Sequence, residues 1–156
     1  MVHAQNNNWF IVTPPAVIVD NAAVTCNVID CLGYDYAQIA VIIGATDIAT
    51  VTLKVQESDT KSNTTALTSG VDVTGLVYGT SNNIAGSASA LPLSTSDNTV
   101  QLFEIDLRKR KRYLLPAVTG GDGVAGTYYT VVAVLSRAED LITTAAGRGC
   151  ADILRV

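Results

Sequence analysis

Apolar and polar residues alternate along much of this chain with the two-residue period of a β-strand. Residues 50–57 are the clearest case, because Val51, Leu53 and Val55 would share one face while polar residues occupy the other. Residues 36–43 form an apolar run of strand length that closes at Gly44. Both segments are rich in β-branched residues, which suit a pleated, half-buried surface. The pattern predicts β-structure.

The same alternation predicts further strands, and two long polar connections separate them. These strands are expected at residues 17–19, 24–29, 71–78, 99–107, 112–118 and 127–136. The connections, residues 58–70 and 79–97, are rich in Ser, Thr, Asn, Gly and Ala. Loops of this length in a compact domain are usually functional or mobile. A single helical turn is expected near residues 138–141.

About eight short strands with long crossing connections favour an all-β, two-sheet antiparallel sandwich of the jelly-roll type. An up-and-down barrel would have shorter and more even connections. We expect the sandwich over residues 16–137, with an N-terminal arm at 1–15 and a C-terminal arm at 138–156. A chain of 156 residues is long enough to bury the core of one such domain.

Both expected arms carry apolar residues. In the N-terminal arm, Trp9, Phe10 and Ile11 precede Pro14 and Pro15, which cannot donate to a β-ladder. This segment reads either as an edge strand after a frayed terminus or as an apolar anchor on a neighbouring subunit. The C-terminal arm ends with the apolar pair Ile153 and Leu154. We expect these five apolar residues to contribute to an interface with a neighbouring subunit of an assembly.

Charge is sparse, which narrows the classes of partner. Only 15% of the residues are charged, and 48% are hydrophobic. A protein that covers its faces in an assembly needs fewer surface charges than a free monomer. The net charge of −4 argues against a dedicated nucleic-acid binder, and no apolar stretch approaches the length of a membrane span. The first residues lack the pattern of a signal peptide, so assembly in the cytoplasm is expected.

Residues that could carry catalysis or bind a cofactor are few. The one histidine, His3, lies at the start of the chain, which makes a nucleophile–histidine pair improbable. The spacing of Cys26 and Cys31 does not suit zinc, so free thiols are expected. The glycine-rich residues 120–126 lack the Lys-Ser/Thr of a phosphate loop and are explained by a hairpin. We therefore expect no enzyme, metal or cofactor, with a carboxylate pair among Asp30, Asp35, Asp47 and Glu57 as the remaining alternative.

Five of the ten Lys and Arg residues are consecutive, at positions 108–112. This run reads as docking to an acidic protein surface, as a solvated turn between two strands, as a nuclear-localisation look-alike or as a nucleic-acid contact. Strand alternation would place Arg108, Arg110 and Arg112 on one side and the two lysines on the other. Because arginine binds carboxylates bidentately, the arginine side is the expected interface.

Four segments together resemble virion proteins encoded among the head genes of tailed bacteriophages. They are Gly-Tyr-Asp-Tyr at 33–36, Leu-Lys-Val-Gln-Glu-Ser-Asp at 53–59, the stretch 105–114 around the basic run, and Leu-Ser-Arg-Ala-Glu at 135–139. The resemblance spans roughly residues 29–140 and leaves both expected arms uncovered. Lys109 and Lys111 depart from it, because relatives are expected to carry less charge there.

The resemblance implies a decoration or cement protein, a small β-sandwich on the outside of the capsid. Its implied partners are the major capsid protein and further copies of itself, as a homo-dimer or homo-trimer. The sparse charge, the arms and the lack of catalytic residues agree with this role. The alternative is a carbohydrate- or receptor-binding sandwich of the head-fibre kind, which would require exposed aromatics on one face. The available residues are Tyr34, Tyr36, Tyr78, Tyr128 and Tyr129.

Overall fold

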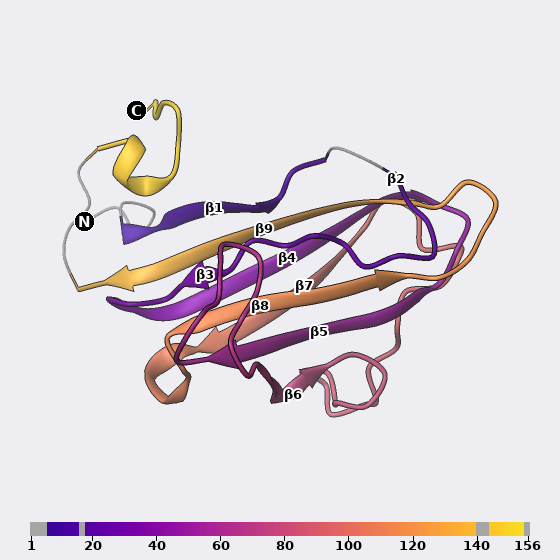
Figure 1. The fold of residues 1–156 in the computed structure, drawn as a ribbon, viewed down its shortest axis with the longest axis horizontal. Helices are drawn as coiled ribbons and strands as arrows, with labels where there is room; N and C mark the ends of the chain where they lie inside the picture. The colour runs from indigo at the N-terminus through magenta and orange to yellow at the C-terminus, as the bar shows by residue number, and fades with distance from the viewer. Residues whose placement is uncertain (1–5, 16–17, 140–143, 155–156) are drawn as a thin grey trace.

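A computed structural model describes residues 6–15, 18–139 and 144–154 of the chain. The described residues form nine strands and two short 3₁₀-helices (Figure 1). The strands are β1 (Asn8–Thr13), β2 (Ile18–Val19), β3 (Ile29–Asp30), β4 (Tyr34–Thr46), β5 (Thr50–Ser58), β6 (Val71–Val77), β7 (Thr99–Asp106), β8 (Tyr113–Gly120) and β9 (Thr127–Ala138). The 3₁₀-helices are η2 (Leu107–Lys109) and η3 (Ala146–Arg148). No described helix is long and apolar enough to cross a membrane.

The strands pair in two antiparallel sheets that pack face to face. Sheet A has the order β1-β9-β4-β7, with β2 also paired to β9, and sheet B has the order β3-β8-β5-β6. With β2 taken as a continuation of β1 along β9, this winding is that of a jelly roll, because β1 pairs with β9, β3 with β8, β4 with β7 and β5 with β6. The expected two-sheet sandwich is therefore confirmed.

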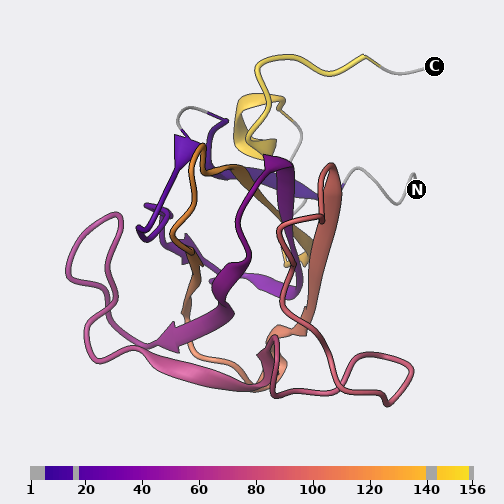
Figure 2. The ribbon, with the colours of Figure 1, turned by 90° about the vertical axis from the view of Figure 1, so that its right-hand side faces the viewer.

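The core lies between the inner faces of the two sheets. On β4 the buried residues Ala37, Ile39, Val41 and Ile43 alternate with less buried ones, as the two-residue period requires. The inner faces of β5, β7, β8 and β9 contribute in the same way, with Leu53, Val55, Phe103, Ile105, Leu114, Val118, Val131, Ala133 and Leu135 all buried. Figure 2 shows the sheets as separate layers, with the two long connections extending away from them.

Most of the expected strands are present, with one local exception inside β5. Leu53 and Val55 face the core as expected, but Val51 is exposed and Thr50 is buried instead. The pairing of β5 with β8 shifts register between Thr50 and Thr52. This irregularity reverses which side chains face the core before residue 52. The buried Thr50 hydroxyl forms a hydrogen bond with the hydroxyl of Tyr129 at 2.9 Å.

The strand expected at residues 24–29 is wrong except at its end, where Ile29 begins β3. Residues 24–28 are irregular, and their backbone groups bond outside any ladder. Val24 donates to the carbonyl of Val118, and Val28 donates to the carbonyl of Thr64 in the connection 58–70. Val24 and Cys26 are still buried, so the alternating pattern correctly indicates which side chains are buried, although this segment forms no regular strand.

The glycine-rich residues 120–126 do not form a hairpin, because they connect β8 of sheet B to β9 of sheet A. Asp47 stabilises this crossing: its carboxylate accepts hydrogen bonds from the backbone N–H groups of Val124, Ala125 and Gly126 at 2.7–2.9 Å. These bonds, led by that from Ala125, lower the pKa of Asp47. A carboxylate from the β4–β5 connection therefore takes the place of hairpin pairing.

The expected N-terminal arm is, over its described part, a strand of sheet A. β1 pairs with β9 from Asn8, opposite Leu135, to Thr13, opposite Val131. Its two prolines follow the strand and end it instead of detaching the segment. Of the helical turn expected near 138–141, Ala138 is the last residue of β9, and residues 140 and 141 lie outside the described residues.

The described part of the C-terminal segment packs against β1 (Figure 1). Arg148 in η3 is buried and donates from Nε to the carbonyl of Asn7 at 3.1 Å. Gly149 lies so close to β1 that an added Cβ would be 1.8 Å from the carbonyl oxygen of Trp9. η3 and Gly149 are therefore docked on the outer edge of sheet A.

Candidate interaction surface

The outer face of sheet A carries rows of side chains that the strand register defines. One row runs from Trp9 on β1 through Val134 and Gln38 to Glu104 on β7. The next row is Ile11, Val132, Ala40 and Leu102. A third joins Thr130, Ile42 and Val100. Across these three rows Glu104 is the single charged residue, although the face points away from the core.

Large apolar side chains on this face are exposed. The exposed fraction is 45% for Trp9, 67% for Ile11, 39% for Ile42, 58% for Val100 and 45% for Leu102. Val132, Val134 and Ala40 are partly exposed between them. We call these eight residues the apolar face. Contiguous exposed apolar patches of this kind mark interaction sites on soluble proteins.

Of the three anchor residues expected near the N-terminus, two lie on the apolar face and the third does not. Trp9 and Ile11 point outward, whereas Phe10 points inward and packs against the core. Alternation along β1 explains the difference, because neighbouring residues of a strand face opposite sides of the sheet. Phe10 therefore stabilises the sandwich instead of forming a surface anchor.

The basic run, residues 108–112, forms an exposed turn that connects β7 of sheet A to β8 of sheet B; we call it the basic turn. Arg108 and Arg110 each pair with a carboxylate of the same chain. Arg108 donates from Nε to Oδ1 of Asp106 at 2.9 Å, and the guanidinium holds the pKa of Asp106 well below its usual range. Arg110 pairs with Glu57 at 3.5 Å. η2 interrupts the strand here, so the expected alternation across the run is absent.

The third arginine of the basic turn, Arg112, binds Asp30 on β3 bidentately, at 2.9 Å and 2.7 Å. This pair lowers the pKa of Asp30. Lys109 and Lys111 form no ion pair with any described residue, although the backbone N–H of Lys111 donates to Glu57. The three arginines are therefore matched by carboxylates of the same chain, whereas the two lysines carry charge that no described carboxylate matches; the expected role of the arginines in an interface stays a prediction.

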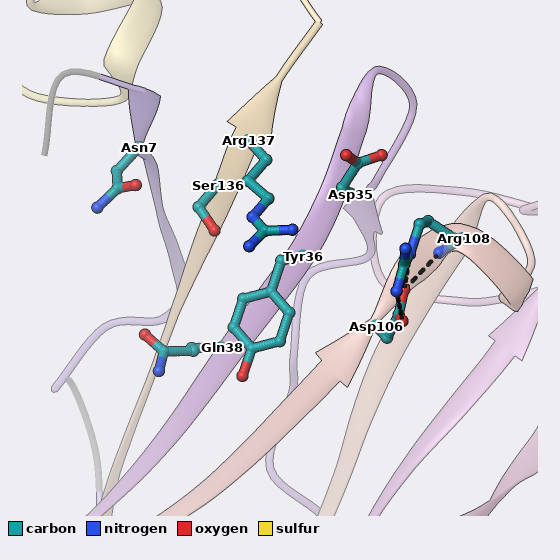
Figure 3. A pocket seen from close by; sticks show the side chains of 8 residues that line it. All are labelled: Asn7, Asp35, Tyr36, Gln38, Asp106, Arg108, Ser136 and Arg137. Atoms are coloured by element: carbon teal, nitrogen blue, oxygen red, sulfur yellow. Dashed lines mark hydrogen bonds and ion pairs between the residues drawn. The ribbon is translucent and has the colours of Figure 1, made fainter. Parts of the chain in front are cut away.

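A polar hollow of about 360 Å³ lies at the end of the outer face of sheet A (Figure 3). Four of its lining residues are charged: Asp35, Asp106, Arg108 and Arg137. Arg137 has a φ of 56°, in the left-handed region that few non-glycine residues adopt. Its side chain lies between Ser136 and Tyr36 in Figure 3. Burial, followed by the neighbouring carboxylate of Glu104, raises the pKa of Tyr36.

The two apolar residues expected at the C-terminal end follow η3. Leu154 is almost fully exposed and Ile153 is half-buried. They follow η3, which contacts β1, the strand that also carries Trp9 and Ile11. Their expected role in an interface stays a prediction.

Most of the described residues considered for catalysis or metal binding are buried or bonded to other groups of the chain. Cys26 and Cys31 are buried free thiols, and burial raises the pKa of Cys31 to about 12. His3 lies outside the described residues. Among the described residues, no group of three or more His, Cys, Asp or Glu side chains could hold a metal ion. Of the four carboxylates considered for a catalytic pair, Asp30 and Glu57 bind arginines and Asp47 binds backbone N–H groups.

The five tyrosines considered for a carbohydrate- or receptor-binding face do not assemble on one surface. Tyr129 is buried in the core, and Tyr34 accepts a hydrogen bond from Asn8 at 2.8 Å. Tyr78 packs edge-on against Phe103 and donates to the carbonyl of Leu102. Tyr36 and Tyr128 share the outer face of sheet A, but Tyr36 pairs with Ser136 near one end of β9 and Tyr128 with Ile18 near the other. This arrangement offers no aromatic platform.

Sequence reasoning did not identify Ile42, Val100 and Leu102 as surface residues. The signal that could have found them is a run of consecutive apolar residues, as in residues 39–43, because such a run places apolar side chains on both faces of one strand.

Comparisons with protein-family models, curated proteins and solved structures find no match for this chain.

Proposed function

We propose that this chain is a capsid cement protein, a structural protein that binds the outer surface of a tailed-bacteriophage capsid and stabilises it. The proposal begins from the resemblance of residues 33–36, 53–59, 105–114 and 135–139 to phage virion proteins. The jelly-roll sandwich is compatible with it, since such sandwiches serve as rigid scaffolds for binding surfaces on virus particles.

The observation that carries the proposal is the apolar face. Eight apolar side chains stand on four adjacent strands with Glu104 as the only charge among them. Such a face is favoured in water only when another protein surface covers it, because burial of exposed apolar area is the main driving force for association. A role inside an assembly accounts for this face better than a role as a free monomer.

The basic turn supports contact with the shell itself. Its three arginines are matched by carboxylates of the same chain, so Lys109 and Lys111 are the charges available to an acidic partner. Exposed charges at the rim of an interface mainly steer and orient the partners, and their effect weakens with salt. We propose that these lysines, not the arginines, meet acidic side chains of the major capsid protein.

The experiment is co-sedimentation of the purified protein with expanded capsids that lack it, over a range of salt concentrations. Lys109→Ala and Lys111→Ala should each weaken binding about two- to five-fold at low salt and reduce its salt dependence, as expected for exposed ion pairs. Lys54→Ala is the matched control, because Lys54 is already paired with Asp72 on sheet B. Deleting residues 1–15 is a poor test, since it would remove β1 from its sheet.

Capsid heat stability supplies a second readout. Bound protein should raise the temperature at which expanded capsids lose their contents, and the lysine variants should do so only at higher protein concentration. A protein that does not co-sediment with capsids at any salt concentration would contradict the proposed function. Equal binding by Lys109→Ala, Lys111→Ala and wild type would contradict the role of the basic turn alone.

A further inference from the structure

The apolar face has a register that can match a second copy of itself. Trp9 and Glu104 stand at opposite ends of one row, and Ile11 and Leu102 stand at opposite ends of the next. We propose that two copies of this chain form a dimer by stacking their apolar faces, with the two-fold axis parallel to the strands. This dimer forms without the capsid and covers the apolar face, which leaves the basic turn as the contact with the shell in the proposed function.

The size of the face is that of a small specific dimer interface. Four strands about 4.8 Å apart and roughly eight residues long, at about 3.3 Å per residue, cover about 500 Å². The hollow at one end and Tyr128 with Ile18 at the other extend this footprint toward the ~800 Å² that each partner buries in a standard interface. Two sheets that stack face to face lie about 10 Å apart, which leaves room for side chains of this size.

The charges at the rim agree with a second copy better than with a strongly charged partner. The hollow holds Asp35 and Asp106 beside Arg108 and Arg137, so its formal charges cancel. A face that meets its own copy must avoid an excess of one sign, because like charges would then oppose each other across the dyad. A face adapted to a charged partner would carry that excess.

The direction of the axis follows from the rows. A half-turn about an axis parallel to the strands exchanges the two ends of every row, so β1 of one copy covers β7 of the other. Ile11 then packs on Leu102 of the second copy, and Trp9 lies over its Glu104. The Trp9 indole N–H has no hydrogen-bond acceptor among the described residues, and Glu104, which accepts from Gln38, retains free lone pairs.

The decisive experiment is charge rescue, measured by sedimentation velocity at micromolar concentration. Wild type should be a dimer. Ile11→Lys and Leu102→Glu should each weaken dimerisation about 30-fold or more, because each buries an unpaired charge in the interface. The double variant Ile11→Lys/Leu102→Glu should recover most of the dimer, since each lysine then faces a glutamate of the other copy.

Rescue within one chain is ruled out by distance, because three strand spacings, about 14 Å, separate the two positions. Leu93→Lys is the matched control: Leu93 is 62% exposed but lies in the connection between β6 and β7, and this variant should remain a dimer. All substituted positions are exposed, so thermal unfolding should show folded protein in every case. Trp9 is the only tryptophan, and its fluorescence should shift to the blue as the protein dimerises.

Two outcomes would overturn the inference. A wild-type protein that is monomeric throughout the micromolar range excludes the dimer. If Ile11→Lys then abolishes capsid binding by that monomer, the capsid is the partner of the apolar face. Monomeric single variants that the double variant does not rescue would exclude an axis parallel to the strands.

Discussion

Arg112, the residue before β8, forms a bidentate pair with Asp30 of the short edge strand β3, with Nε–Oδ1 and Nη2–Oδ2 distances of 2.9 Å and 2.7 Å. The guanidinium also lies over the ring of Tyr113, 4.8 Å from its centroid. The strand pairing between β3 and β8 covers only two residue pairs, and this side-chain contact adds to it beside the buried side chain of Ile29.

We expect Asp30→Asn to lower the melting temperature by roughly 1–3 °C at pH 7, because a half-exposed ion pair contributes modestly. Arg112 lowers the pKa of Asp30, so this stabilisation is fully present above the ordinary aspartate pKa near 3.9. It is lost as the pH falls through the depressed value of the folded state. Melting temperatures of wild type and Asp30→Asn should therefore differ at pH 7 and converge in acid. A constant difference down to pH 2 would contradict the pairing.

Asp47→Ala should loosen the crossing between β8 and β9, because three backbone N–H groups lose their acceptor. The expected result is a melting temperature lower by a few degrees and faster amide exchange at Val124, Ala125 and Gly126. The pKa of Asp47 is lowered, so the difference from wild type should also disappear in acid. Asp122→Ala, an exposed acid in the same connection, is the control and should change neither quantity.

Gly149→Ala should displace the C-terminal segment from β1. Gly149 has a φ of 71°, and the added methyl group would collide with the backbone carbonyl of Trp9. Fluorescence of Trp9 should change, and proteolysis after η3 should become faster. Gly33→Ala is the matched control, because Gly33 also has a positive φ but has open space at its Cβ position. Equal effects of both variants would attribute the result to backbone strain alone.

The three cysteines should differ in reactivity. Cys26 and Cys31 are buried, and burial raises the pKa of both thiols, so neither should react with a disulfide reagent in the folded protein. Cys150 is only partly buried and should react first. Titration of native protein should therefore yield about one thiol per chain, rising to three after unfolding. Rapid reaction of all three in native protein would contradict the burial of the core around β3.

Local alternation was sufficient to predict most strands, and long-range contacts account for what it missed. β5, β6, β7, β8 and β9 follow the predicted segments closely, because their side chains report which face is buried. Pro14 and Pro15 led to the expectation of a free arm, but the eight residues before them include a complete strand whose partner, β9, is more than a hundred residues away. No local pattern encodes that pairing.

The charged residues illustrate the same limit. Each cation of the basic turn is visible in the sequence, but whether it is available depends on carboxylates that the fold brings near. Glu57 and Asp30 reach Arg110 and Arg112 only because β5 and β3 both lie beside β8. Among these ion pairs, the one between Asp106 and Arg108, two residues apart, is the one that the local sequence could indicate.

The pairing of the first and last strands of the sandwich also bears on how the chain could be rewired. Asn8 begins β1 opposite Leu135, close to the end of β9, so both ends of the sandwich lie at the same end of sheet A (Figure 1). A short linker from the end of β9 to the start of β1 would close the chain without breaking any strand pairing. New ends could then be opened in the connection between β6 and β7, which projects from the sandwich (Figure 2). Such a circular permutant would keep both sheets while placing its new ends beside β7, at the edge of sheet A opposite β1.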